Sequence, residues 1–170
     1  MLARLGLDAS ARVKTLSKGT REKLQLILVM SRAAKLYLLD EPIGGVDPAT
    51  RDYILRTIIG NYNEDASVVI STHLIEDVQS VCDQIVVIHH GTILFTGTPE
   101  QLIQAAEGHV GVFWEREAGQ EQGLHITARV NTSQGVRCRA VADALPAYVQ
   151  RSEPSLEDAY LYLIAQGATA

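Results

Sequence analysis

The chain has 170 residues, which is enough for one domain of ordinary size whose core needs no metal or disulfide. Acidic residues outnumber basic ones by 20 to 15, and the net charge of −5 argues against a protein that coats nucleic acid. Hydrophobic residues make up 46% and charged residues 21%, which excludes wholesale disorder, and the two cysteines are too few for a zinc framework or a disulfide scaffold.

The first part of the chain alternates helices with short apolar strands. In chain order the expected elements are a helix at 18–34, a strand at 36–39, a helix from Pro48 that closes at Gly60, a strand at 67–71, a helix at 74–82, strands at 84–88 and 92–95, and a helix at 99–106. The continuous apolar runs at 36–39 and 67–71 are typical of strands covered on both faces. Gly91 predicts a hairpin, and the alternating order predicts a parallel sheet in an α/β layer.

The pattern changes after Gly108. Strands are expected at 110–114, 124–130 and 136–141, with polar turns at 118–123 and 132–135 and a final helix at 155–166. We therefore predict an α/β part over residues 1–108 and a small α+β accessory domain over residues 109–170.

The strongest local signal is the carboxylate pair Asp40-Glu41, directly after the strand at 36–39. Ligands of α/β folds bind at the carboxyl ends of the strands. One carboxylate there can hold Mg²⁺, directly or through water, and the next can orient or deprotonate an attacking water. The alternative interpretation is a solvated pair of acids at the start of a loop.

Two further signals lie near helix and strand ends. His73 follows the strand at 67–71, where an imidazole can hydrogen-bond a phosphate oxygen, although a lone histidine is more often structural. Ser17 and Gly19 precede the first long helix, whose N-terminus offers N–H groups, a hydroxyl and partial positive charge to an anion. A simple N-cap by Ser17 is the alternative.

Taken together, the order of these motifs resembles the ATPase domain of ATP-binding cassette (ABC) transporters. Residues 16–20 resemble the signature loop, 36–41 the Walker B strand, 45–47 the D-loop, His73 the switch histidine, 91–102 the strand pair and helix that follow, and 153–160 the closing helix of exporter-type subunits. The resemblance implies the back part of a P-loop NTPase layer, with parallel strands and helices, plus a small C-terminal α+β extension.

The resemblance also implies roles for individual residues. In this family two ATPase domains dimerise head to tail around two ATP molecules. By resemblance, Ser17 and Gly19 contact the γ-phosphate of an ATP held by the opposite subunit, and Lys18 between them is counted among the nucleotide-binding residues because its charge favours phosphate. Asp40 binds Mg²⁺ through water, Glu41 is the general base, Asp47 connects the two sites, and His73 contacts the γ-phosphate. Phosphoryl transfer needs this kind of positioning and charge neutralisation.

Three features depart from the family pattern. Lys18 stands where a small residue is usual, and Thr20 stands where Gln is common. The sequence contains no G-x-x-x-x-G-K-[S/T] motif, which supplies the loop that cradles the β- and γ-phosphates. We therefore expect the C-terminal part of an ABC ATPase, which alone neither binds ATP tightly nor hydrolyses it. Its sheet is expected to have an uncovered edge that favours an intimate dimer.

The predicted function is that of an ATP-binding and ATP-hydrolysing subunit of an ABC transporter. ATP and Mg²⁺ are the expected cofactors, and a second ATPase subunit and a transmembrane permease subunit are the expected partners, with no nucleic acid. No apolar run is long enough to cross a bilayer. The resemblance implies a cytoplasmic subunit attached to the membrane through the permease. The alternatives are a non-transport ABC ATPase and a non-enzymatic regulatory or dimerisation module, in which residues 109–170 bind a partner.

Overall fold

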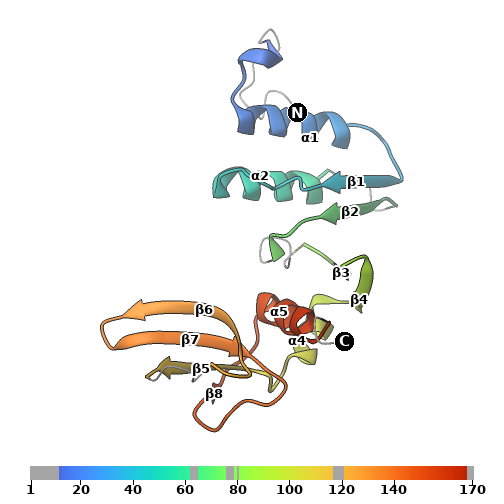
Figure 1. Ribbon diagram of the computed structural model, residues 1–170. Helices are drawn as coiled ribbons and strands as arrows, with labels where there is room; N and C mark the ends of the chain where they lie inside the picture. Colours follow the sequence, from blue (N-terminus) through green and yellow to red (C-terminus); the bar gives the residue numbers. More distant parts are fainter. Residues whose placement is uncertain (1–11, 62–64, 76–78, 80, 117–120, 168–170) are drawn as a thin grey trace. The chain divides into compact units, whose positions relative to one another are not determined.

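The structure is a computed structural model that describes residues 12–61, 65–75, 79, 81–116 and 121–167 (Figure 1). The chain divides into two compact units, Met1–Val81 and Cys82–Ala170. The described strands form one two-stranded sheet in the first unit, and a two-stranded and a four-stranded sheet in the second, and each unit has its own helices. Within the described ranges, no helix has both the length and the apolar character that a membrane span requires.

The first unit combines helices with a parallel pair of strands. Its elements are η2 (Val13–Thr15), α1 (Lys18–Met30), β1 (Leu36–Asp40), α2 (Pro48–Ile59) and β2 (Ser67–Ser71). β1 and β2 pair in parallel, with Asp40 opposite Ser71, as the alternating order predicted. The helix predicted at 74–82 includes residues outside the described part of the chain.

Local capping sets the helix ends of this unit. Asp47 accepts a hydrogen bond from the Thr50 N–H at 3.1 Å, and Pro48 begins α2, as the sequence predicted. α1 ends at Met30, so the predicted end at Ala34 was wrong. The Ser31 hydroxyl donates to the Leu28 carbonyl at 2.9 Å, and the Tyr37 hydroxyl donates to the Arg32 carbonyl. These side-chain bonds accompany the exit of the chain from the helix before it enters β1.

One face of the β1–β2 pair is open. Tyr37 and Leu39 are buried, whereas Leu36 and Leu38 are 53% and 70% exposed and Val69 on β2 is 53% exposed. The prediction that these strands are covered on both faces was therefore wrong for the described part of the chain. A short continuous apolar run is consistent with a strand, but it does not reveal how many layers cover that strand.

The second unit begins with a hairpin and continues into a larger antiparallel sheet. Its elements are β3 (Ile85–His89), β4 (Thr92–Gly97), α4 (Pro99–Ala105), β5 (Val110–Glu115), β6 (His125–Thr132), β7 (Gly135–Val141), β8 (Gln150–Arg151) and α5 (Leu156–Gly167). β3 and β4 pair antiparallel across His90 and Gly91, which both have positive φ, so the predicted hairpin is confirmed. Among the described strands, the parallel pairing is thus limited to β1 and β2.

The C-terminal sheet has the strand order β6-β7-β5-β8, and α5 packs on β6 and β7 (Figure 1). A cluster of buried side chains on its strands and the following loop contains Phe113, Cys138, Ala140 and Val149. α4 packs against α5, and the compact unit that contains both helices begins at Cys82. The boundary predicted after Gly108 marks where the sequence pattern changes, and it stays a prediction.

Candidate functional site

The carboxyl ends of β1 and β2 bring together the acid pair and the histidine. His73 Nδ1 lies 2.9 Å from Glu41 Oε1, and Asp40 is opposite Ser71 in the strand register. The Ser71 hydroxyl donates a hydrogen bond to Asp40 Oδ1. This convergence follows from the parallel pairing, because parallel strands present their carboxyl ends at the same edge.

A tight turn after β1 sets the direction of Glu41. Glu41 has a φ of 45°, in the left-handed region, and its N–H donates to the Ser71 carbonyl at 3.0 Å. The Gly44 N–H donates to the Glu41 carbonyl at 3.1 Å, which closes the turn. The turn therefore ends the strand and places the Glu41 carboxylate beside His73.

This carboxylate–imidazole pair is open to solvent. The side chains of His73 and Glu41 are 72% and 43% exposed. A carboxylate within hydrogen-bond reach of water can accept a proton from it, and an imidazole on the same carboxylate can hold its orientation. The arrangement is thus suited to activating a water against a ligand that arrives from outside.

A second group of predicted residues lies where α1 and α2 begin. The Ser17 hydroxyl accepts from the Thr20 N–H at 3.2 Å, so Ser17 caps α1, and Lys18 Nζ donates to the Gly45 carbonyl at 3.4 Å. A methyl group added at Gly19 would lie 3.6 Å from Thr50 Oγ1, so the first turns of the two helices are neighbours. Ser17 thus forms a hydrogen bond at the start of its own helix, and Lys18 forms one with the loop after Glu41.

Asp47 belongs to this second group. Its Oδ2 accepts from the Thr50 hydroxyl at 2.7 Å, and its Oδ1 accepts from the Thr50 N–H. The Thr50 hydroxyl, followed by the Thr50 N–H, lowers the pKa of Asp47 below its ordinary value. Asp47 is therefore a charged N-cap of α2.

The oxygen atoms of the Asp40 carboxylate and the Ser71 hydroxyl suit a hard cation that also has ligands from elsewhere. Within the described ranges, no three His, Cys, Asp or Glu side chains are grouped closely enough to hold a metal ion. Mg²⁺ commonly uses one or two carboxylates and completes its octahedron with waters and substrate phosphates. The exposed Asp40 carboxylate, with the Ser71 hydroxyl beside it, fits that pattern of ligands.

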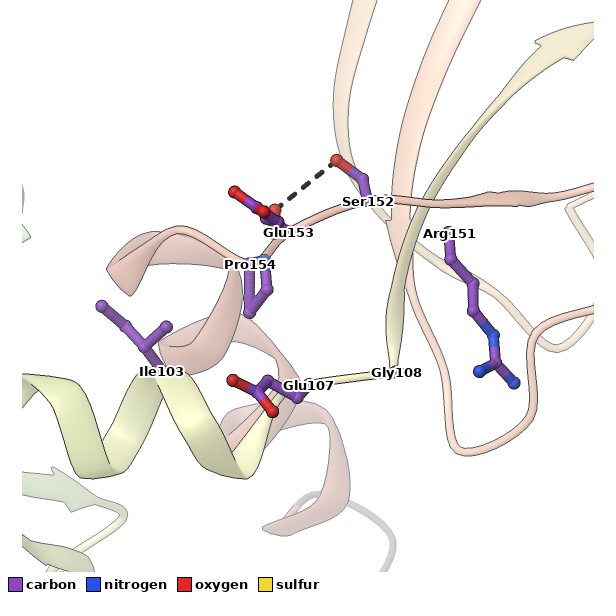
Figure 2. A pocket seen from close by; sticks show the side chains of 7 residues that line it. All are labelled: Ile103, Glu107, Gly108, Arg151, Ser152, Glu153 and Pro154. Atoms are coloured by element: carbon purple, nitrogen blue, oxygen red, sulfur yellow. Dashed lines mark hydrogen bonds between the residues drawn. The ribbon is translucent and has the colours of Figure 1, made fainter.

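The second unit contains an open hollow of about 490 Å³ (Figure 2). Its lining residues are Ile103, Glu107, Gly108, Arg151, Ser152, Glu153 and Pro154. They come from α4 and the loop after it, and from β8 and the segment that leads to α5 (Figure 2). None of the predicted site residues lines this hollow, and its charges are of both signs.

Comparison with known proteins gives one consistent result. The family description "AAA domain, putative AbiEii toxin, Type IV TA system" matches residues 6–76. The Nod factor export ATP-binding protein I of Rhizobium sp. (strain N33) is 29% identical over 160 residues, which cover 94% of this chain and 46% of that protein. The uncharacterized ABC transporter ATP-binding protein YxlF of Bacillus subtilis (strain 168) is 29% identical in an alignment of 185 positions that covers 96% of this chain and 62% of that protein.

A solved structure of an ATP-binding subunit of an ABC transporter matches with a TM-score of 0.53 and 26% identity. The match covers 60% of this chain and 42% of that subunit. In sequence and in fold, the chain is similar to ATP-binding subunits of ABC transporters. The α/β fold class predicted from the sequence is confirmed by the same comparison.

The chain spans about half the length of the curated relatives it matches, for example 46% of the Nod factor export protein. The match of residues 6–76 includes both groups of predicted site residues. The roles of the individual residues stay predictions, because the comparisons do not report on them.

One side chain of the site has no role in the sequence prediction. Ser71 contacts both acids, yet the sequence pointed only to His73 in the run Ser71-Thr72-His73. A signal was present, because Ser71 is the last residue of its strand, as Asp40 is of its own. Only the strand register shows that these two residues are opposite each other.

Proposed function

We propose that this chain is part of the ATP-binding and ATP-hydrolysing subunit of an ABC transporter that couples ATP hydrolysis to transport across a membrane. The observation that carries the proposal is the 2.9 Å contact between His73 Nδ1 and Glu41 Oε1. It lies at the carboxyl ends of parallel strands, next to a carboxylate suited to Mg²⁺.

The first group of residues performs the chemistry at the terminal phosphate. Asp40 would hold Mg²⁺ through water, and the ion would supply neutralisation of the charge on the phosphate oxygens. Glu41 accepts the proton of the attacking water as the general base. His73 orients the Glu41 carboxylate and contacts the γ-phosphate from the same strand edge.

The second group closes on a nucleotide held by another ATPase subunit. The N-terminus of α1 presents N–H groups and the Ser17 hydroxyl to the γ-phosphate, and Gly19 leaves room for a close approach. Lys18 adds a positive charge, and its ammonium is already at the Gly45 carbonyl of the loop that leads to Asp47. Asp47, at the start of α2, then links the two nucleotide sites of the dimer.

The proposal assigns the remaining parts to partners. The sequence has no G-x-x-x-x-G-K-[S/T] motif, so the loop around the β- and γ-phosphates lies outside it. The chain alone therefore neither binds ATP tightly nor turns it over. A second ATPase subunit and a transmembrane permease complete the assembly, with this subunit on the cytoplasmic face of the membrane.

The test uses the assembled transporter that contains this chain, reconstituted in lipid vesicles. Glu41→Gln removes the general base, so the rate of ATP hydrolysis should fall by about 10²–10⁴-fold while ATP binding persists. Asp52→Asn is the matched control, because it removes an exposed carboxylate of the same unit that pairs with Arg56 on α2. Equal hydrolysis by Glu41→Gln and Asp52→Asn would contradict the proposal.

A further inference from the structure

Ser71 contacts both acids of the candidate site. Its hydroxyl donates to Asp40 Oδ1 and also accepts from the Glu41 N–H at 3.2 Å. Its carbonyl accepts from the same N–H at 3.0 Å. A single residue at the end of β2 thus holds the carboxylate of one acid and the backbone of the next.

The side chain of Ser71 forms a hydrogen bond with Asp40 that its backbone cannot form. Any residue at position 71 would offer a carbonyl to the Glu41 N–H, because that bond comes from the main chain. The bond to Asp40 requires a hydroxyl. Since Asp40 is exposed and lies at the end of its strand, this hydroxyl is the contact that limits rotation of the carboxylate.

The bond leaves Asp40 free to bind a cation. A carboxylate has about four lone-pair sites, and one hydroxyl donor occupies one of them. Neighbours that orient a ligand without displacing the metal commonly affect metal affinity by about 10- to 100-fold. The Ser71 hydroxyl has the position and the chemistry of such a neighbour.

The same strand contains an internal comparison. Ser67 is at the other end of β2, on the same open face, and is opposite Leu36 instead of an acid. Ser67 is exposed, as Ser71 is. A substitution at Ser67 therefore removes a hydroxyl from the same strand and face without touching a carboxylate.

We propose that Ser71 is a positioning residue that holds the Asp40 carboxylate in the orientation in which it ligates Mg²⁺ at the bound nucleotide. This inference rests on the proposed function, which supplies the metal and the nucleotide. It adds a residue, and a contact between the strands, to the site.

The first test measures the orientation of Asp40 directly in this chain. Three-bond NMR couplings between Asp40 Cγ and the backbone nitrogen and carbonyl carbon report its χ1 rotamer. We expect one rotamer in the wild type, in Ser71→Thr, which keeps the hydroxyl, and in the control Ser67→Ala. We expect averaged couplings in Ser71→Ala. Unchanged Asp40 couplings in Ser71→Ala would overturn the inference.

The second test measures the metal requirement of the assembled transporter. In Ser71→Ala the Mg²⁺ concentration for half-maximal ATP hydrolysis should rise about tenfold. The rate at saturating Mg²⁺ should stay within a few-fold of wild type, and Ser71→Thr should restore the requirement. A loss of rate without a change in the Mg²⁺ requirement would indicate a merely structural role and overturn the inference.

The two tests separate failure of the inference from failure of the proposed function. A wild-type complex without Mg²⁺-dependent hydrolysis would overturn the proposed function, and with it the metal role of Asp40. Normal Mg²⁺-dependent hydrolysis together with wild-type couplings and Mg²⁺ requirement in Ser71→Ala would overturn the inference alone.

Discussion

Replacing Asp158 by Ala should destabilise the second unit more than any exposed acid of α5 can. Asp158 is only 3% exposed and joins the first turn of α5 to β7. Its Oδ1 accepts from Arg139 Nε at 2.8 Å, and its Oδ2 accepts from Arg139 Nη2 at 2.7 Å. Oδ2 also accepts from the Ser155 N–H at 2.8 Å and the Ser155 hydroxyl at 2.7 Å.

The magnitude follows from how much of this pair is buried. Removing one partner of a buried ion pair costs about 3–5 kcal/mol, because the other charge loses its compensation. The Arg139 side chain is 28% exposed, so water offsets part of that loss, and we expect a cost at the lower end of this range. A loss of about 3 kcal/mol in a unit of this size lowers Tm by about 12–24 °C.

The chain supplies its own probe for this experiment. Trp114 is the single tryptophan of the sequence and lies in β5, so its fluorescence reports unfolding of the second unit. Glu157→Ala is the control, because it removes an exposed acid from the same helical turn and should cost about 1 kcal/mol or less. Similar Tm values for Asp158→Ala and Glu157→Ala would refute the reasoning.

The same pair predicts a dependence on pH. Burial raises the pKa of Asp158, but hydrogen bonds from Arg139 and Ser155 outweigh burial and lower it below the ordinary value of 3.8. A carboxyl group with a lowered folded-state pKa stabilises the fold above its unfolded pKa, and this contribution is lost as the pH falls through the folded-state pKa. The difference in Tm between wild type and Asp158→Ala should therefore shrink below about pH 4. A difference that stays constant down to pH 2 would show that the charge of Asp158 does not contribute.

Two further predictions concern His73 and Gly111. In the assembled transporter, His73→Ala should reduce the rate of ATP hydrolysis by about 10²-fold or more. The control His125→Ala, on the edge strand β6, should not reduce it. Equal rates for the two variants would exclude a role of His73. Gly111→Ala should lower the Tm followed by Trp114 fluorescence, because the added methyl would lie 2.4 Å from Val149 Cγ1 and 2.8 Å from the Gln150 carbonyl. Val149→Ala in that background should recover part of the loss. A wild-type Tm in Gly111→Ala would contradict the prediction, because it would show that β5 and the segment at Val149 and Gln150 move apart at no cost.

Much of the fold could be predicted because its signals are local. Asp47-Pro48 and Thr98-Pro99 begin α2 and α4, since a capping side chain and the next three residues are all that an N-cap needs. The β3–β4 hairpin likewise follows from a turn with positive φ at Gly91. The two-residue strand β8 was not predicted, because it exists only through its pairing with β5.

The candidate site, too, was determined partly by the sequence and partly by the tertiary structure. The sequence by itself determined that Asp40, Glu41 and His73 follow apolar strands, and their order indicated the ABC ATPase family. Tertiary structure alone decided that His73 contacts Glu41, that Ser71 holds Asp40, and that one face of these strands is open. The physical reason is distance along the chain: residues some thirty positions apart meet only through the register of β1 and β2, and no local preference encodes that register.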